Sequence, residues 1–279
     1  MDFKMNKRGK KSKIFFNRSS LTSQTRGQVT IFIIIAIMVI SAITLFFVFR
    51  EDAIIEIGGG GIGNPEAFFN SCIKDKIEES IIVISLHGGY IDNPLHKEFK
   101  FEGEDFVNIS YLCYTQSNYA TCINQKPLFT QDLKKEIKNY ISSDVEDCFN
   151  EMVESFSRGY TVDPNYNDFE VELLPKRVII QTDLRMTLTK SGESTEYKNF
   201  EITVASRLYE ISNLVQEIVN QEAEFCYAED LGISLTYPEF KIDKLTTEES
   251  LIYSIEHEDS EEKFRFALRT CVIPPALGL

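Results

Sequence analysis

An apolar segment at residues 29–49, interrupted only by the polar residues Thr30, Ser41 and Thr44, constrains this chain more than any other feature. It reads VTIFIIIAIMVISAITLFFVF and contains no charged residue. A helix rises about 1.5 Å per residue, so a helix of this length matches the hydrocarbon core of a bilayer. The segment exceeds the roughly 7 to 15 apolar residues of a secretory leader, and no small-residue cleavage site follows it. It therefore predicts a retained transmembrane helix in contact with the lipid bilayer.

The charges on either side of this segment predict its orientation. Residues 1–28 carry eight Lys or Arg and one Asp, a net charge of +7, and the whole chain carries −14, which leaves −21 for the remainder. By the positive-inside rule, the basic segment 1–28 is cytoplasmic and the acidic body is extracellular. The acidic body would repel phosphates, so nucleic acid is not expected as a partner.

The junction between the basic and apolar segments reads Arg26-Gly27-Gln28. It resembles the class III signal of archaeal type IV pilins and archaellins, in which a prepilin-type peptidase cuts after the glycine. The resemblance covers residues 26–49 and implies cleavage between Gly27 and Gln28, with that peptidase as a partner. Bacterial type IV pilins carry a glutamate five residues into the mature chain, where this sequence has Phe32. Archaellin-like signals lack that glutamate, so the resemblance is to the archaeal branch.

Six cysteines lie beyond the apolar segment, and none precedes it. An even number confined to the external side predicts three disulfides, for which 15 pairings exist. One pair brackets a short polar loop, and another would join two predicted helices, which leaves the last two cysteines as the third pair. The expected pairs are Cys113 with Cys122, Cys72 with Cys148, and Cys226 with Cys271. A zinc site is disfavoured because the chain has no C-x2-C spacing.

Residues 50–63 are expected to form a glycine-rich linker. Gly58, Gly60 and Gly63 match the spacing of a dinucleotide-binding fingerprint, G-x-G-x-x-G. That fingerprint requires a parallel βαβ unit with an acidic residue at the end of its second strand, and the following sequence supplies none. A flexible hinge explains the glycines, and no cofactor is expected.

Residues 64–279 are expected to form one disulfide-stabilised α+β domain of helices packed on antiparallel sheet. Apolar residues at helical spacing predict helices at 64–86, 130–156 and 208–228. The sequence leaves open whether Ser142-Ser143-Asp144 divides the second helix in two. Period-two alternation predicts a meander at 169–173, 178–188 and 200–204, and a final hairpin at 251–256 and 264–271. Helices and strands in blocks, without βαβ alternation, define the α+β class.

Two polar motifs in this domain suggest specific chemistry. Asn108-Ile109-Ser110 is an acceptor sequence for N-glycosylation on the expected external side. Asp163, Asn165 and Asn167 have the spacing of the first ligands of a calcium loop, but the glycine and glutamate that should follow are missing. An Asp-Pro-Asn turn is the expected structure there.

Catalytic residues are not expected. Only His87, His96 and His257 could act as the usual base, and G-x-S-x-G, H-E-x-x-H and P-loop motifs are absent from the sequence. Carboxylate pairs such as Glu222 and Glu224 are expected on solvated faces in so acidic a chain. His87 is expected to lie at the end of the first helix, where a cation suits the helix dipole.

These features predict a single-pass cell-surface protein with a pilin-like signal and a non-catalytic structural or binding domain. Its partner would be another surface protein or a second copy of the chain. The alternative is a subunit of a type IV pilus-like filament or pseudopilin complex. The glycines at 58–63 interrupt the continuous helix that pilins extend into their globular domain, which disfavours the filament. A membrane-anchored surface hydrolase is the least favoured function.

Overall fold

The structure describes part of the chain. The computed structural model places residue 34, residues 37–41 and residues 63–273. The chain divides into two compact units, residues 1–60 and residues 61–279. In the first unit, residues 34 and 37–41 are helical and exposed. Among the described residues, no helix is long and apolar enough to cross a bilayer. The basic segment 1–28 with Gly27 and Gln28, most of the segment 29–49 and the linker up to residue 62 lie outside the described residues.

The second unit opens with α2 (Pro65–Leu86), which confirms the first predicted helix. Asn64 caps it, because its Oδ1 accepts a hydrogen bond of 3.0 Å from the backbone N–H of Glu66. The helix ends at its C-cap, His87. Gly88 and Gly89 follow with φ of +74° and +81°, a backbone conformation that favours glycine.

The second helix, α3 (Phe129–Ser157), runs unbroken through residues 142–144. Ser142 and Ser143 are exposed, while Ile141 and Val145 on either side of the cluster are buried, so packing outweighs the local competition for hydrogen bonds. α3 lies antiparallel to α2: Cys72 in the first half of α2 is bonded to Cys148 in the second half of α3, and Glu79, later in α2, accepts a hydrogen bond from Tyr140, earlier in α3. The two helices are a covalently linked pair.

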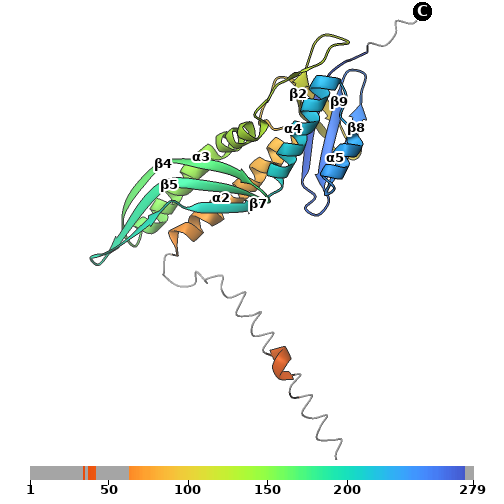
Figure 1. The fold of residues 1–279 in the computed structure, drawn as a ribbon. Coiled ribbons are helices and arrows are strands. Elements are labelled where there is room, and N and C mark those ends of the chain that lie inside the picture. The colour runs from red at the N-terminus through yellow and green to blue at the C-terminus, as the bar shows by residue number, and fades with distance from the viewer. Residues whose placement is uncertain (1–33, 35–36, 42–62, 274–279) are drawn as a thin grey trace, which may run out of the picture. The chain divides into compact units, whose positions relative to one another are not determined.

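A four-stranded antiparallel sheet packs on this helix pair (Figure 1). Central strand β5 is flanked on one edge by β4 and on the other by β6 and β7. The strands are β4 (Thr161–Leu174), β5 (Arg177–Lys190), β6 (Glu193–Lys198) and β7 (Glu201–Ala205). The three predicted strands are confirmed as β4, β5 and β7, with their alternating apolar residues buried, whereas β6 was not predicted.

The predicted Asp-Pro-Asn turn is wrong, because Asp163, Pro164 and Asn165 lie within β4. Proline has no backbone N–H to donate, but an edge strand such as β4 tolerates it. The ladder is irregular between Tyr166 and Asp168, which leaves Asn167 out of register.

The second sheet is mixed, whereas antiparallel pairing was expected. Its order is β1-β2-β10-β9-β8, with β3 also paired to β2, and β2 runs parallel to β10. The strands are β1 (His96–Lys100), β2 (Phe106–Tyr114), β3 (Ile123–Asn124), β8 (Phe240–Thr246), β9 (Leu251–His257) and β10 (Lys263–Arg269). The predicted last hairpin is confirmed as β9 and β10, with Cys271 beyond the end of β10. The fold class is therefore α+β with one antiparallel and one mixed sheet.

Two helices complete the body on the side of the second sheet (Figure 1). α4 (Leu208–Phe225) confirms the third predicted helix, but it stops before residue 228 because Cys226 adopts a left-handed conformation with φ of 57°. α5 (Asp230–Thr236) has no counterpart among the predicted elements.

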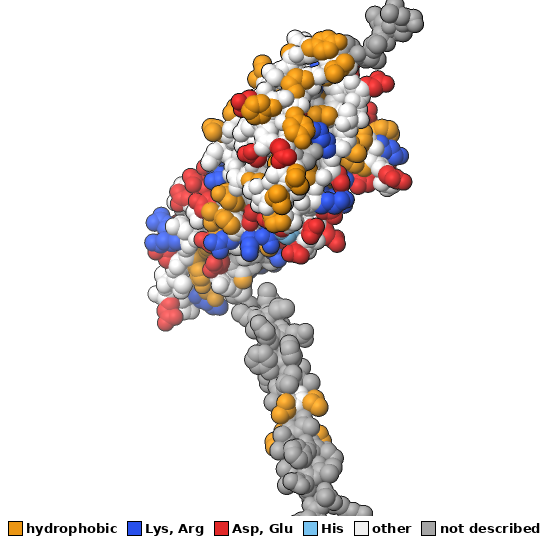
Figure 2. Space-filling view, turned by 45° about the vertical axis from the view of Figure 1, so that its right-hand side comes forward, with side chains coloured by type: hydrophobic (Ala, Val, Ile, Leu, Met, Phe, Trp, Pro, Cys, Tyr) orange, Lys and Arg blue, Asp and Glu red, His pale blue; other side chains and the backbone are white. Residues whose placement is uncertain are grey.

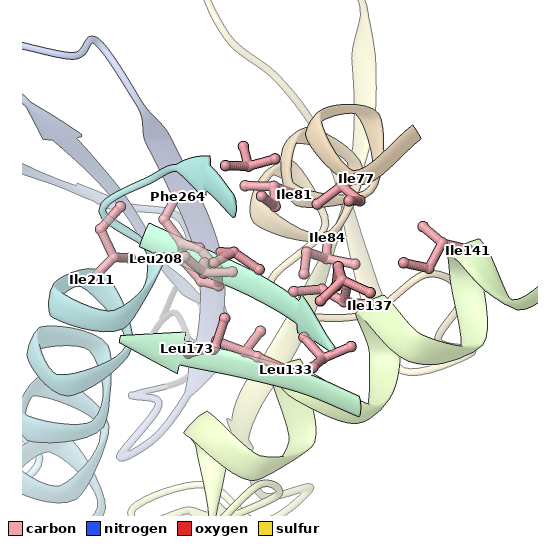
Figure 3. Close-up of a cluster of buried hydrophobic side chains, with 14 of the residues drawn as sticks. Ile77, Ile81, Ile84, Leu133, Ile137, Ile141, Leu173, Leu208, Ile211 and Phe264 are labelled. Atoms are coloured by element: carbon pink, nitrogen blue, oxygen red, sulfur yellow. The ribbon is translucent and has the colours of Figure 1, made fainter. Parts of the chain in front are cut away.

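One main apolar core connects both sheets to α2, α3 and α4. Figure 3 shows isoleucines of α2 and α3 pointing toward one another, with Leu173 of β4 near Leu133 and Phe264 of β10 near Leu208 of α4. A smaller cluster on the other face of the second sheet holds Ile109, Tyr111 and Ile252. Strand β10 is thus buried on both faces, and residues 63–273 form one continuously packed body.

Candidate functional site

Three disulfides stabilise the body, and their pairs are those expected from the sequence. The first joins α2 to α3, the second closes the loop between β2 and β3, and the third joins the C-cap of α4 to a residue two positions beyond the end of β10. The pairs and their Cα–Cα distances are Cys72–Cys148, 6.0 Å, Cys113–Cys122, 5.4 Å, and Cys226–Cys271, 5.9 Å. Each pair lies within the usual distance range for a disulfide.

The three histidines lie in different settings, and His257 comes nearest to a catalytic arrangement. His257 is buried at the end of β9 and packs against Phe240. Its Nδ1 accepts a hydrogen bond of 3.1 Å from the backbone N–H of Ser260 and lies 3.0 Å from Ser260 Oγ. Glu262 accepts from Ser260 Oγ at 3.1 Å and also from the backbone N–H of Arg207.

This network differs from a hydrolase triad in its connections. A triad places the acid on one ring nitrogen of the histidine and the nucleophilic serine on the other. Here the Glu262 carboxylate accepts a hydrogen bond from Ser260, and Nδ1 of His257 accepts one from a backbone N–H. The contacts close the turn between β9 and β10 and attach it to the start of α4.

A polar hollow of about 290 Å³ lies beside β1 and β2. His87, His96, Glu98, Phe106 and Asn108 are among the residues that line it. The ring Nδ1 of His96 lies 2.6 Å from a backbone carbonyl oxygen, so it donates its hydrogen there. The structure therefore brings two of the predicted histidines to the same hollow as the predicted glycosylation site.

An acidic hollow of about 440 Å³ is lined by residues of the first sheet, including Asp168, Glu170, Asp183 and Glu201. The ammonium of Lys138 lies 2.7 Å from Asp168 and lowers the pKa of that carboxyl through this hydrogen bond. Among the residues that the structure describes, no group of three or more potential ligands is arranged to hold a metal ion.

The residues with the spacing of a calcium loop are spread along a strand. Asp163 and Asn165 pair across the ladder with residues of β5, and Asn167 donates through Nδ2 to Asp183 at 3.0 Å. A calcium loop must curl around the ion so that successive side chains converge on it. In an extended strand, residues two positions apart are separated by about 6–7 Å along the chain, so Asp163, Asn165 and Asn167 do not converge on one point and do not form such a loop.

Sequence reasoning placed Glu222 on a solvated face, and this was wrong. Glu222 of α4 is fully buried, and its Oε1 accepts hydrogen bonds from Lys244 at 2.7 Å and from the hydroxyl of Tyr253 at 2.5 Å. Its Oε2 has no hydrogen-bond partner among the described residues. The sequence did indicate that Glu222 is buried, because it follows Ile218 by four residues on the apolar stripe of α4.

Large apolar side chains are exposed near the end of α4 and on α5. Phe225, Tyr227, Leu231 and Leu235 are all more than half exposed. Figure 2 shows hydrophobic side chains scattered over the upper part of the body, whereas charged side chains crowd its lower part. Phe225 and Tyr227 line the same hollow at the end of α4.

Comparison with known proteins gives no relative. No protein-family model matches the chain, and neither a curated protein nor a solved structure matches it at a significant level.

Proposed function

We propose that this chain is a single-pass cell-surface protein whose α+β body has a non-catalytic structural or binding role outside the membrane. The three disulfides carry the proposal, because disulfides persist in oxidising compartments. The apolar segment 29–49 supports membrane attachment, and the net charge of +7 before it supports a cytoplasmic amino terminus.

The exposed apolar residues support a binding role for the body. Phe225 and Tyr227 flank Cys226, whose disulfide to Cys271 fixes the chain at this point. Exposed aromatic residues held on a rigid backbone lose little conformational entropy when a partner covers them. Another surface protein is the expected partner in this role.

A second function, a subunit of a type IV pilus-like filament or pseudopilin complex, is favoured by Arg26-Gly27-Gln28. In this alternative, a prepilin-type peptidase cuts between Gly27 and Gln28, and a second copy of the chain is the partner. Edman sequencing of the protein purified from its own membrane separates the two functions. A mature chain that begins at Gln28 supports the filament, whereas one that begins at Met1 supports a permanently anchored surface protein.

Labelling of intact cells with a membrane-impermeant amine reagent tests the orientation. Lys190 and Lys241 are exposed on the body, whereas Lys4 and Lys13 precede the apolar segment. We expect label on the body lysines of intact cells, and on the early lysines of an uncleaved chain only after the cells are permeabilised. Label on Lys4 and Lys13 of intact cells, with none on the body, would overturn the proposed placement.

A further inference from the structure

We propose that Asn108 carries an N-linked glycan whose first sugar packs against the ring of Phe106 in the polar hollow beside β1 and β2. The inference rests on the external placement proposed above, because N-glycosylation takes place on that side of the membrane. It adds a modification site and a structural role for the attached sugar.

The first observation is the arrangement of the two residues on β2. Asn108 and Phe106 are both exposed and lie two residues apart on one strand, so their side chains leave the same face. Phe106 is 66% exposed, an unusual state for a phenylalanine, and both residues line the hollow of about 290 Å³. Among the described residues, none forms a hydrogen bond with the side-chain amide of Asn108, which leaves this amide available for attachment.

The second observation is the chemistry of the surrounding surface. A pyranose ring has an apolar face of C–H groups and a rim of hydroxyls. The exposed ring of Phe106 suits the apolar face, because contact removes apolar surface of both partners from water. Glu98 pairs across the ladder with Asn108, and His96 pairs with Ser110, so β1 offers hydrogen-bonding groups to the hydroxyls. The volume of the hollow, near the lower end of the range for small-molecule sites, suits a single sugar.

The burial of Ser110 in the folded body determines when Asn108 can be modified. Ser110, which completes the acceptor sequence, is 2% exposed, and its backbone N–H donates to the carbonyl of His87 at 3.3 Å. A glycosylating enzyme has to recognise this serine together with the asparagine, so it acts before β2 packs against the end of α2. The folded body is not a substrate for it.

The sequence contains a matched control for the test. Asn17-Arg18-Ser19 has the same acceptor pattern, but it precedes the apolar segment and is cytoplasmic in the proposed orientation. Peptide mass spectrometry of the full chain from its own cells, in parallel with Asn108→Gln, measures both positions. We expect a sugar mass on the peptide with Asn108, its loss in Asn108→Gln, and no sugar mass at Asn17 in any uncleaved chain.

The possible failures can be distinguished. If Asn108 is unmodified while Lys190 and Lys241 are labelled on intact cells, the glycan inference is overturned and the external placement stands. If Asn17 is modified and Asn108 is not, the orientation itself is overturned, together with the glycan.

A thermal unfolding cycle tests the contact between the sugar and Phe106. Phe106→Ala should lower the melting temperature of the glycosylated protein by several degrees, but by less than about one degree in the Asn108→Gln background. Leu235→Ala, which removes another exposed apolar side chain, should act equally in both backgrounds. An equal effect of Phe106→Ala in the two backgrounds would show that the sugar does not pack on this ring.

Discussion

Arg265 and Glu104 form a bidentate ion pair that joins β10 to the turn between β1 and β2. Nη1 of Arg265 lies 2.6 Å from Oε2 of Glu104, and Nη2 lies 2.7 Å from Oε1. The Arg265 side chain is 6% exposed, and its guanidinium lies 3.8 Å from the ring centroid of Phe101. This ion pair attaches the β1–β2 hairpin, on which Asn108 lies, to β10 in the middle of the second sheet.

Loss of Glu104 should destabilise the body, because Arg265 would keep its buried charge without a counter-ion. We expect Glu104→Gln to lower the free energy of unfolding by about 1–2 kcal/mol, less than the roughly 3–5 kcal/mol for a fully buried pair, because Glu104 is partly exposed. Urea denaturation of the purified protein measures this. Glu154→Gln removes an exposed pair with Arg158 and should cost less than about 0.5 kcal/mol. Equal losses in the two variants would contradict the prediction.

The stability of the body should fall at acid pH. Hydrogen bonds from Arg265 lower the pKa of Glu104 below its ordinary value of 4.5, and the bond from Lys138 lowers the pKa of Asp168 below 3.8. A carboxyl with a lowered folded pKa stabilises the protein above its unfolded pKa, and this contribution is lost as pH falls through the folded pKa. We therefore expect the melting temperature to fall below about pH 4.5. Glu104→Gln should weaken the dependence of melting temperature on pH, whereas Glu224→Gln, at an exposed position, should change it little. If both variants show the same pH dependence, Glu104 is not a source of the acid sensitivity.

The buried pair of Glu222 and Lys244 should be sensitive to the removal of one partner. Lys244→Met leaves the Glu222 carboxylate buried without its cation, which should cost about 3–5 kcal/mol of unfolding free energy. The double variant Glu222→Gln with Lys244→Met removes both charges and should recover a large part of that loss. Lys241→Met, on the same strand but 61% exposed, is the control and should have a small effect. A double variant no more stable than Lys244→Met would rule out charge burial as the cause.

The disulfides should differ in how much they stabilise the fold. The bridge Cys72–Cys148 spans 76 residues and Cys113–Cys122 spans 9. In the chain-entropy model, their removal costs about 4–5 and about 2–3 kcal/mol respectively. Paired serine variants, compared by urea denaturation, measure the difference. A larger loss from opening the short loop would indicate that local strain or packing outweighs chain entropy.

Local periodicity made α2, α3, α4 and the long strands of the first sheet predictable. α2 has a proline at its first position, an asparagine cap and two glycines at its end, so propensity and packing agree on its bounds. In β5, the alternation of buried residues from Val178 to Leu188, broken at Ile179, predicts a strand with one buried face. In such segments, the conformational preference of each residue agrees with that of its neighbours and with the packing of the fold.

Non-local pairing accounts for most of what the sequence did not reveal. The parallel contact of β2 with β10 joins Tyr111 to Ala267, and no local pattern encodes the direction of such a pair. α5 is only seven residues long, too short for a clear helical period. The exposure of Phe106 could not be predicted from the sequence either, because a phenylalanine in an alternating strand normally points toward the core.

The position of β10 in the second sheet determines when that sheet can be completed. β10 lies between β2 and β9, yet residues 263–269 are among the last of the body to leave the ribosome. Until they emerge, β2 and β9 each keep an unpaired edge, although the helix pair and the first sheet are already synthesised. Two strand edges therefore stay open during synthesis, and a chain halted before Lys263 should aggregate or be degraded.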